Sequence, residues 1–164
     1  MSAFVSVSLP ARLDAESSFA FGRALAPLAS EGVLVIGSGS LTHNLYEVRP
    51  GGFDEVYVGE FSAWVRQAIL ADDHDRLRKT LEMAPHARRA HPTPEHFWPL
   101  LVAAGAASSS QPVTIIDGGI THGVLAMDAF LFGQKLAPNP QTEALSPAKP
   151  SGPSPLPGSE VSRG

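Results

Sequence analysis

The most informative stretch of this chain is Val33-Leu34-Val35-Ile36-Gly37-Ser38-Gly39-Ser40-Leu41-Thr42-His43-Asn44, residues 33–44. Residues 33–36 form a continuous apolar run rich in β-branched side chains, which is typical of a central strand buried on both faces of a sheet. Residues 37–40 form a glycine-rich turn, in which the main chain can approach a substrate or a metal closely. Because open α/β sheets bind ligands at the carboxyl ends of their strands, the pattern predicts a functional site at this turn.

Strand-like and helix-like patterns alternate on both sides of this stretch. Residues 5–9 are predicted to form a first strand, and apolar side chains at helical spacing predict an amphipathic helix over 15–30 that ends at Gly32. Further along, helical spacing predicts three helical segments, at 61–69, 72–83 and 94–106. Two short strands are predicted at 113–116 and 124–127, as a hairpin or a neighbouring pair. The sequence therefore predicts an α/β fold with a central, mostly parallel sheet flanked by helices.

The composition of the chain changes near Gly133. Seven of the 15 prolines follow this residue, interleaved with serine, glycine, asparagine and glutamine and with few large apolar side chains. Such a segment cannot bury enough apolar surface to offset the entropy lost on ordering. Residues 137–164 are therefore predicted to be a disordered Pro/Ser/Gly-rich tail, with a polyproline-type recognition segment as the alternative, and residues 1–136 to form the folded domain.

The composition also excludes or disfavours several classes of protein. The 164 residues contain no cysteine, which excludes disulfides, thiolate metal sites and cysteine nucleophiles and leaves His, Asp and Glu as metal ligands. A formal net charge of -4 lacks the basic footprint of a nucleic-acid-binding protein. No apolar run approaches the length of a membrane span, and the apolar N-terminus lacks the basic residues of a secretory signal. We therefore expect a cytoplasmic protein without nucleic-acid or membrane partners.

His43 is the first candidate for chemistry. It follows the predicted strand 33–36 directly, together with Asn44, at the edge of the sheet where a ligand is expected. The alternative is that His43 and Asn44 only satisfy main-chain groups of the turn. A phosphate-binding loop is disfavoured because residues 37–39 lack the third glycine of a dinucleotide fingerprint and the lysine of a P-loop. A metal-independent hydrolase is disfavoured as well, because no nucleophile and base lie at a suitable spacing.

A second polar cluster begins at His91. Thr93 is a natural N-cap and Pro94 a natural first helical residue, which predicts that Glu95 and His96 lie in the first turn of a helix. The positive end of a helix favours a carboxylate or a neutral imidazole, the forms that a divalent cation requires. One of the two histidines is therefore a candidate metal ligand while the other orients a neighbour or the substrate; the alternative is an ordinary capped helix start. The remaining histidines are expected on the surface or at a strand end: His74, His86 and His122.

The chain carries three recognisable motifs in order, EGVLVIGSGSLTHNL at 31–45, HPTPEHFWPLL at 91–101 and GVLAMD at 123–128. Together they resemble the class III extradiol ring-cleavage dioxygenases, and within that class the 4,5-DOPA dioxygenase branch. The resemblance covers residues 5–132 and does not extend into the proline-rich tail. It implies a non-haem Fe(II) enzyme that opens a catecholic ring beside its two hydroxyls and inserts both atoms of O2, with Zn(II) possible at the same site.

The resemblance also implies roles for individual residues. His43 is similar to the acid/base residue of the family, which moves protons, and His96 is similar to a metal ligand. His91 and Asn44 are implied to bind the substrate at the wall of the pocket. Glu95 is a second candidate ligand, because other branches of the class complete their metal site with a carboxylate.

The sequence departs from the family on its N-terminal side. Family members carry a His-Gly-Ser-Pro motif and a Ser-Ala-His-Trp motif there, whose histidines are two of the metal ligands, and neither motif occurs in this sequence. The resemblance therefore predicts that residues 1–136 are a partial extradiol dioxygenase catalytic domain, truncated at the N-terminus. We expect its partners to be a small catecholic substrate, O2, and a complementing N-terminal half or a second copy in a homo-oligomer. The alternative is a non-catalytic remnant or partner subunit that binds another chain through an exposed sheet edge and apolar surface.

Overall fold

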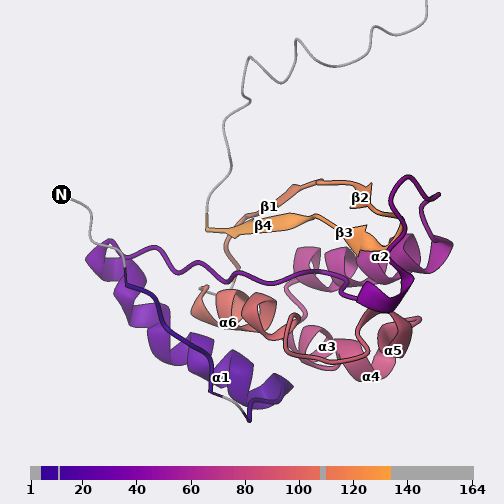
Figure 1. The fold of residues 1–164 in the computed structure, drawn as a ribbon. Coiled ribbons are helices and arrows are strands. Elements are labelled where there is room, and N and C mark those ends of the chain that lie inside the picture. The colour runs from indigo at the N-terminus through magenta and orange to yellow at the C-terminus, as the bar shows by residue number, and fades with distance from the viewer. Residues whose placement is uncertain (1–4, 11, 108–109, 134–164) are drawn as a thin grey trace, which may run out of the picture.

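The computed structural model describes residues 5–10, 12–107 and 110–133, and its regular structure is mostly helical (Figure 1). The α-helices in these ranges are α1 (Ala15–Leu25), α2 (Val56–Leu70), α3 (His74–Arg78), α4 (Thr80–Met83), α5 (Ala87–Ala90) and α6 (Trp98–Ala106). Two short 3₁₀ helices accompany them, η1 (Ala26–Glu31) and η2 (Leu45–Glu47). The predicted tail, residues 137–164, lies outside the described residues.

The strands form two small antiparallel sheets. The first pairs β1 (Val113–Ile116) with β4 (Ala129–Phe132), and the second pairs β2 (Ile120–Thr121) with β3 (Leu125–Ala126). The strand predicted at 113–116 is confirmed, and the one predicted at 124–127 is confirmed in part as the short β3. These two strands do not pair with each other, however, because β3 pairs with β2 and β1 pairs with β4, a strand that the sequence pattern did not predict.

The predicted central, mostly parallel sheet is not seen in the part of the chain that the structure describes. Residues 5–9 and 33–36 are not strands, and the side chains of the second segment are largely open to solvent, with Leu34 72% and Ile36 71% exposed. A β-strand forms only where its main-chain groups bond to a neighbouring strand, and an apolar β-branched pattern does not supply that neighbour. Residues 33–40 instead run as extended chain between α6 and β4 (Figure 1).

Helix α1 confirms most of the helix predicted over 15–30. Asp14 caps it: its carboxylate accepts the Ser17 N–H at 2.8 Å, and the Ser17 hydroxyl accepts the Asp14 N–H at 2.9 Å. The α-helix gives way to η1 near Pro27, which has no N–H to continue the helical hydrogen bonds. Gly32 ends η1 with φ 80°, as predicted.

The core lies between α2 and α6. The helix predicted over 61–69 is the larger α2, which buries Val58, Phe61 and Val65 completely, and Leu101 of α6 is equally buried. The helix predicted over 72–83 is two short helices, α3 and α4. None of the helices in the described ranges is long and apolar enough to cross a membrane.

Helices α1 and α6 cross with their main chains in direct contact. A Cβ atom on Gly22 of α1 would lie 2.1 Å from the carbonyl oxygen of Val102, and one on Gly105 of α6 would lie 2.3 Å from the carbonyl oxygen of Phe19. Real Cβ atoms essentially never come so close to main chain, so glycine is required at both positions. The crossing therefore depends on two residues without side chains.

We predict that Gly105→Ala lowers the free energy of unfolding by about 1–3 kcal/mol, because the added methyl group forces α1 and α6 apart. Gly59→Ala is the matched control: Gly59 is also helical, but a Cβ there has nothing within 4 Å. Alanine is the better helix former, so Gly59→Ala should leave stability unchanged or raise it by up to about 1 kcal/mol. Chemical denaturation followed by circular dichroism measures both, and equal stabilities of the two variants would contradict the close crossing.

Candidate functional site

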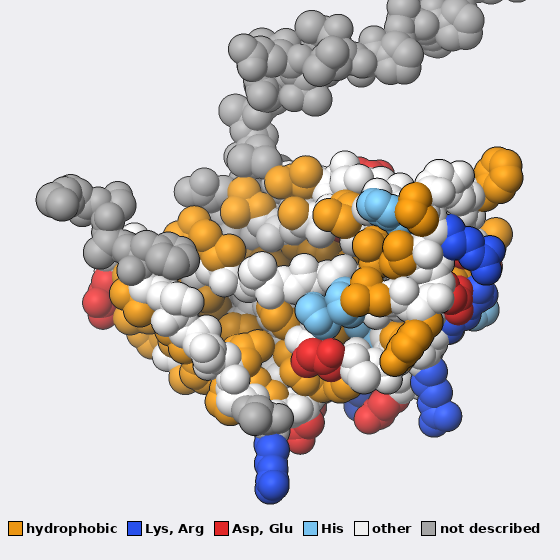
Figure 2. All heavy atoms as spheres, viewed as in Figure 1, with side chains coloured by type: hydrophobic (Ala, Val, Ile, Leu, Met, Phe, Trp, Pro, Cys, Tyr) orange, Lys and Arg blue, Asp and Glu red, His pale blue; other side chains and the backbone are white. Residues whose placement is uncertain are grey.

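Two segments far apart in the sequence place His43 and His96 against each other. Their rings are stacked with centroids 3.5 Å apart and planes at 21°. Both residues are partly exposed, and pale blue histidine side chains meet on the face shown in Figure 2, with hydrophobic side chains nearby. The fold thus brings together the two residues to which the resemblance gives an acid/base role and a metal-binding role.

The glycine-rich turn makes this approach possible. A Cβ atom on Gly37 would lie 2.2 Å from the carbonyl oxygen of Pro99, and one on Gly39 would lie 2.4 Å from the carbonyl oxygen of His96. The sequence predicts that these glycines let main chain approach a substrate or a metal. In the structure they let it approach the main chain at the start of α6.

Thr42 clamps the loop that carries His43. This fully buried residue donates a hydrogen bond from its hydroxyl to the carbonyl oxygen of Val124 at 2.8 Å, and the same hydroxyl accepts the N–H of Ala126 at 2.8 Å. On the other side, the N–H of His43 donates to the carbonyl oxygen of Ala90 at 2.8 Å. Sequence reasoning missed Thr42, since nothing in the local pattern distinguishes it from any threonine in a turn.

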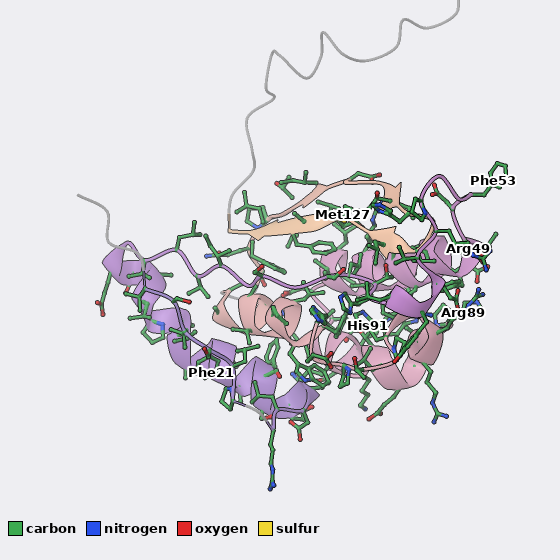
Figure 3. The ribbon with its side chains drawn as sticks, in the orientation of Figure 1. Phe21, Arg49, Phe53, Arg89, His91 and Met127 are labelled. Carbon is green, nitrogen blue, oxygen red and sulfur yellow. The ribbon has the colours of Figure 1, made fainter. Side chains whose placement is uncertain are left out.

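His91 is a buried support of the same loop (Figure 3). Its Nε2 lies 2.8 Å from the carbonyl oxygen of Leu41, which can only accept, so Nε2 carries the proton. The ring packs between Phe61 and Phe97, at centroid distances of 5.6 and 5.4 Å. Burial lowers the pKa of His91, which keeps the imidazole neutral.

Asn44 is also buried, at 4% exposure, and holds the start of η2. Its side-chain oxygen accepts the N–H of Tyr46 at 3.2 Å. These contacts show that Asn44 and His91 hold main chain in place around the loop that carries His43. That both also bind a substrate stays a prediction.

The helix start predicted at Thr93 and Pro94 is wrong, since α6 begins at Trp98. The carbonyl oxygen of His96 accepts the N–H of Ser40 at 3.0 Å and is not used within the helix. His96 therefore lies in the turn before α6 and not in its first turn. The hydrogen bond from Ser40, a residue distant in the sequence, accompanies this boundary, and a local capping pattern does not predict such a contact.

Glu95 lies exposed in the same turn. The Thr93 hydroxyl donates to its carboxylate at 2.7 Å, and this hydrogen bond lowers the pKa of the Glu95 carboxyl. The pKa of His43 is also lowered, first by burial and then by the neighbouring imidazole of His96. At neutral pH the site therefore combines an ionised carboxylate with an uncharged His43 that can accept a proton.

The other histidines lie away from this site. His74 is within 3.1 Å of the Asp72 carboxylate and His86 within 2.7 Å of the Glu60 carboxylate, both in the outer part of the molecule. His122 lies in the turn between β2 and β3 with φ 54°.

The described residues do not complete a metal site. No three His, Asp or Glu side chains among them are placed to hold one ion. The lone pairs of an imidazole lie in its ring plane, and the nearly parallel planes of His43 and His96 do not direct them to a common point. The arrangement suits different tasks for the two rings better than a shared ligand role.

Comparison with known proteins gives a consistent picture. Residues 2–127 match the family described as the catalytic LigB subunit of aromatic ring-opening dioxygenase. Two plant proteins named 4,5-DOPA dioxygenase extradiol are similar: that of Beta vulgaris is 36% identical over 128 residues, and that of Portulaca grandiflora 39% over 129 residues. Each match covers 77% of this chain and 47% of the relative.

Two bacterial proteins are similar over about the same share of the chain. The protein of Escherichia coli K12 named 4,5-DOPA dioxygenase extradiol is 32% identical over 133 residues, which is 79% of this chain and 49% of that protein. The crystal structure of an uncharacterized protein from Escherichia coli K12 superposes with a TM-score of 0.63 at 30% identity, covering 72% of this chain and 50% of that one. The chain thus spans about half the length of the curated relatives it matches.

We predict that Thr42→Val lowers the free energy of unfolding by about 1–3 kcal/mol, because the isosteric change leaves the Val124 carbonyl and the Ala126 N–H buried without a partner. Thr42→Ser keeps the hydroxyl and loses one methyl group, so it should cost about 1 kcal/mol. Denaturant titration of the two variants tests the clamp, which would be refuted if Thr42→Ser were the more destabilising change.

The lowered pKa of His91 predicts a pH dependence of stability. The unfolded chain binds a proton at this residue below pH about 6.5, while the folded chain does not, so stability is complete above that pH and falls as the pH drops toward the lower folded pKa. His91→Gln can still donate to the Leu41 carbonyl and removes the titration. Urea titrations between pH 5 and pH 7.5 should show a steeper acid loss for the unsubstituted chain, and parallel curves would contradict the assignment.

Proposed function

This chain belongs to the family of the catalytic LigB subunit of aromatic ring-opening dioxygenases, and we propose that it forms part of a site that opens a catecholic ring with O2. The observation that carries the proposal is the stacking of His43 on His96, two residues that lie 53 positions apart in different motifs. Relatives with the name 4,5-DOPA dioxygenase extradiol support a DOPA-like catechol as the substrate class.

We assign the proton-transfer step to His43. A catechol must lose hydroxyl protons before its ring can react with O2, and a neutral imidazole that is partly exposed can accept one. Its lowered pKa keeps His43 in that neutral form at pH 7. The main-chain bond to Ala90 and the clamp at Thr42 hold the imidazole in place.

We assign His96 to a metal, Fe(II) or in second place Zn(II), as the resemblance implies. The described residues alone do not fit this role completely, since no three donors converge. The resemblance implies that two further histidines, from N-terminal motifs that this sequence does not contain, would complete the site with His96. Glu95, exposed in the same turn, stays a second candidate ligand.

The second candidate function is a non-catalytic subunit that binds another chain. The observation that favours it is the extended, largely exposed segment 33–36, which has no neighbouring strand in the described ranges. The two functions predict different results when a polypeptide with the unmatched half of a relative is added. The first predicts ring-opening turnover, and the second predicts binding without turnover.

The test is O2 uptake with DOPA and anaerobically loaded Fe(II). The chain alone should show no turnover, and turnover should appear when the part of the Escherichia coli relative outside the match is added as a separate polypeptide. Turnover by the chain alone would show that its own residues complete the metal site. Binding without turnover would favour the non-catalytic subunit.

In the complemented enzyme, His43→Ala should lower kcat by about 100-fold or more and leave the metal content unchanged, because general acid–base catalysis contributes about that much. His96→Ala should lower both kcat and metal content. His74→Ala, a histidine paired with Asp72 away from the site, is the matched control and should change neither. Equal metal contents in the His43 and His96 variants would contradict the two roles.

A further inference from the structure

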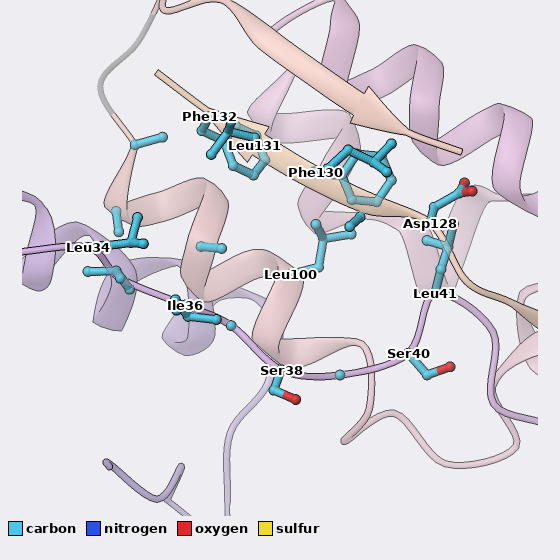
Figure 4. A pocket seen from close by; sticks show the side chains of 18 of the residues that line it. Leu34, Ile36, Ser38, Ser40, Leu41, Leu100, Asp128, Phe130, Leu131 and Phe132 are labelled. Carbon is cyan, nitrogen blue, oxygen red and sulfur yellow. The ribbon is translucent and has the colours of Figure 1, made fainter. Parts of the chain in front are cut away.

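A cavity of about 610 Å³ separates residues 33–41 from β4 (Figure 4). The extended segment forms one wall, residues 128–132 form the opposite wall, and Leu100 and Ala103 of α6 contribute to the lining between them. Figure 4 shows that the two walls run in opposite directions, with Leu34 near the Phe132 end and Leu41 near Asp128. We refer to this cavity as the slot.

Both walls of the slot are main chain without a partner on the side of the cavity. From Leu34 to Gly39 the main chain makes no hydrogen bond within the described ranges. Strand β4 bonds to β1 along one edge, and in the described structure its other edge is not paired. Unpaired strand edges are templates for a further strand, because each N–H and C=O along them lacks a partner.

The side chains that line the slot are mostly apolar. Its lining includes Leu34, Ile36, Phe130 and Phe132, and Asp128 is its only acidic or basic side chain besides the imidazole of His96. The Asp128 carboxylate is already bound by Arg66 at 2.6 Å. Among the described residues, the other polar side chains of the slot are those of Ser38, Ser40 and Gln111, and most of the lining is apolar. An extended chain with apolar side chains satisfies both the open main-chain groups and the apolar walls.

The geometry points to the slot as the docking site of a β-strand from a polypeptide that supplies the half of the relatives' length not covered by this chain. The chain matches 47% to 49% of its curated relatives and 50% of the similar solved structure, so the relatives contain about as many residues again outside the match. A strand inserted between residues 34–39 and β4 would join the separate β1–β4 pair and the extended segment into one sheet. This inference concerns binding and does not depend on the proposed ring-opening activity.

A second copy of this chain is the less suitable occupant. The slot is closed by a wall on each side, so two identical slots cannot pair edge to edge, and each copy would have to offer a free strand. Residues 5–9 are the extended apolar segment available for that purpose, with Val5 79% and Val7 62% exposed. Dimer formation through these residues is therefore the competing outcome of the test.

The experiment is amide hydrogen exchange of the full chain, alone and with the part of the Escherichia coli relative outside the match as the added polypeptide. Alone, the amides of residues 34–39 should exchange near the rate of an unstructured peptide, because they make no hydrogen bonds to other described residues. With the polypeptide bound, alternate amides in 34–39 and those of β4 that face the slot should slow at least about tenfold.

Ile36→Pro is the matching variant, because proline removes an N–H from the slot wall and is incompatible with strand pairing there. It should weaken binding of the polypeptide at least tenfold, about 1.4 kcal/mol. Val7→Pro is the control, an exposed extended residue outside the slot, and should leave binding unchanged. Ile36→Asp, which keeps the N–H and places a charge on the apolar wall, should weaken binding as well, and circular dichroism shows whether each variant retains the helices.

Protection of both walls with loss of binding in the residue 36 variants supports the proposal. Three results would overturn it: no binding of the added polypeptide, binding with protection only outside the slot, or protection of the slot in the chain alone that rises with its concentration and is abolished by Val7→Pro. The last result would assign the slot to a second copy. None of these readouts uses catalytic activity, so failure here is distinguishable from failure of the proposed function.

Discussion

Main chain packs directly against main chain around helix α6, and these contacts position both α1 and the loop that carries His43. Gly22 and Gly105 bring α1 onto one side of the helix, and Gly37 and Gly39 bring the extended segment onto its beginning. No residue with a side chain can occupy these four positions without moving one of the elements. The second contact also sets the distance between residues 40–43 and the turn before α6, and so determines that His43 stacks on His96.

Buried hydrogen bonds then hold the site in that position. The Thr42 hydroxyl ties the loop to the main chain on either side of Leu125, and the imidazole of His91 ties it at the Leu41 carbonyl. These polar groups are buried. Breaking one of these hydrogen bonds would therefore cost the free energy of the bond and also leave a buried donor or acceptor without a partner. The same burial lowers the pKa of His91, and the partial burial of His43 lowers the pKa of that residue in the functional site.

The extended segment at residues 33–36 leaves apolar side chains exposed to solvent, although the helices near it are well packed. Leu34 and Ile36 are exposed although they belong to the most apolar run between α1 and α2. The described helices bury a dense core around Phe61 and Leu101, but none of the strands in the described ranges pairs with residues 33–36. Apolar area exposed along an unpaired edge is a strong driving force for association with a further strand.

Features that depend on neighbours in the chain could be predicted from the amino-acid sequence. The helical spacing and the Gly32 stop predicted the helical stretch that forms α1 and η1, the apolar run at 113–116 predicted β1, and the motifs around His43 and His96 indicated the family. The roles of His43 and His96 stay predictions. Other features could be seen only in the three-dimensional structure: residues 33–36 pair with no other described strand, β1 pairs with β4, α6 begins at Trp98, and Thr42 holds the loop that carries His43. The physical reason is the same in each case: caps and helical periods are satisfied within a few residues, whereas a strand, a captured carbonyl or a buried hydroxyl needs a partner from a distant part of the chain.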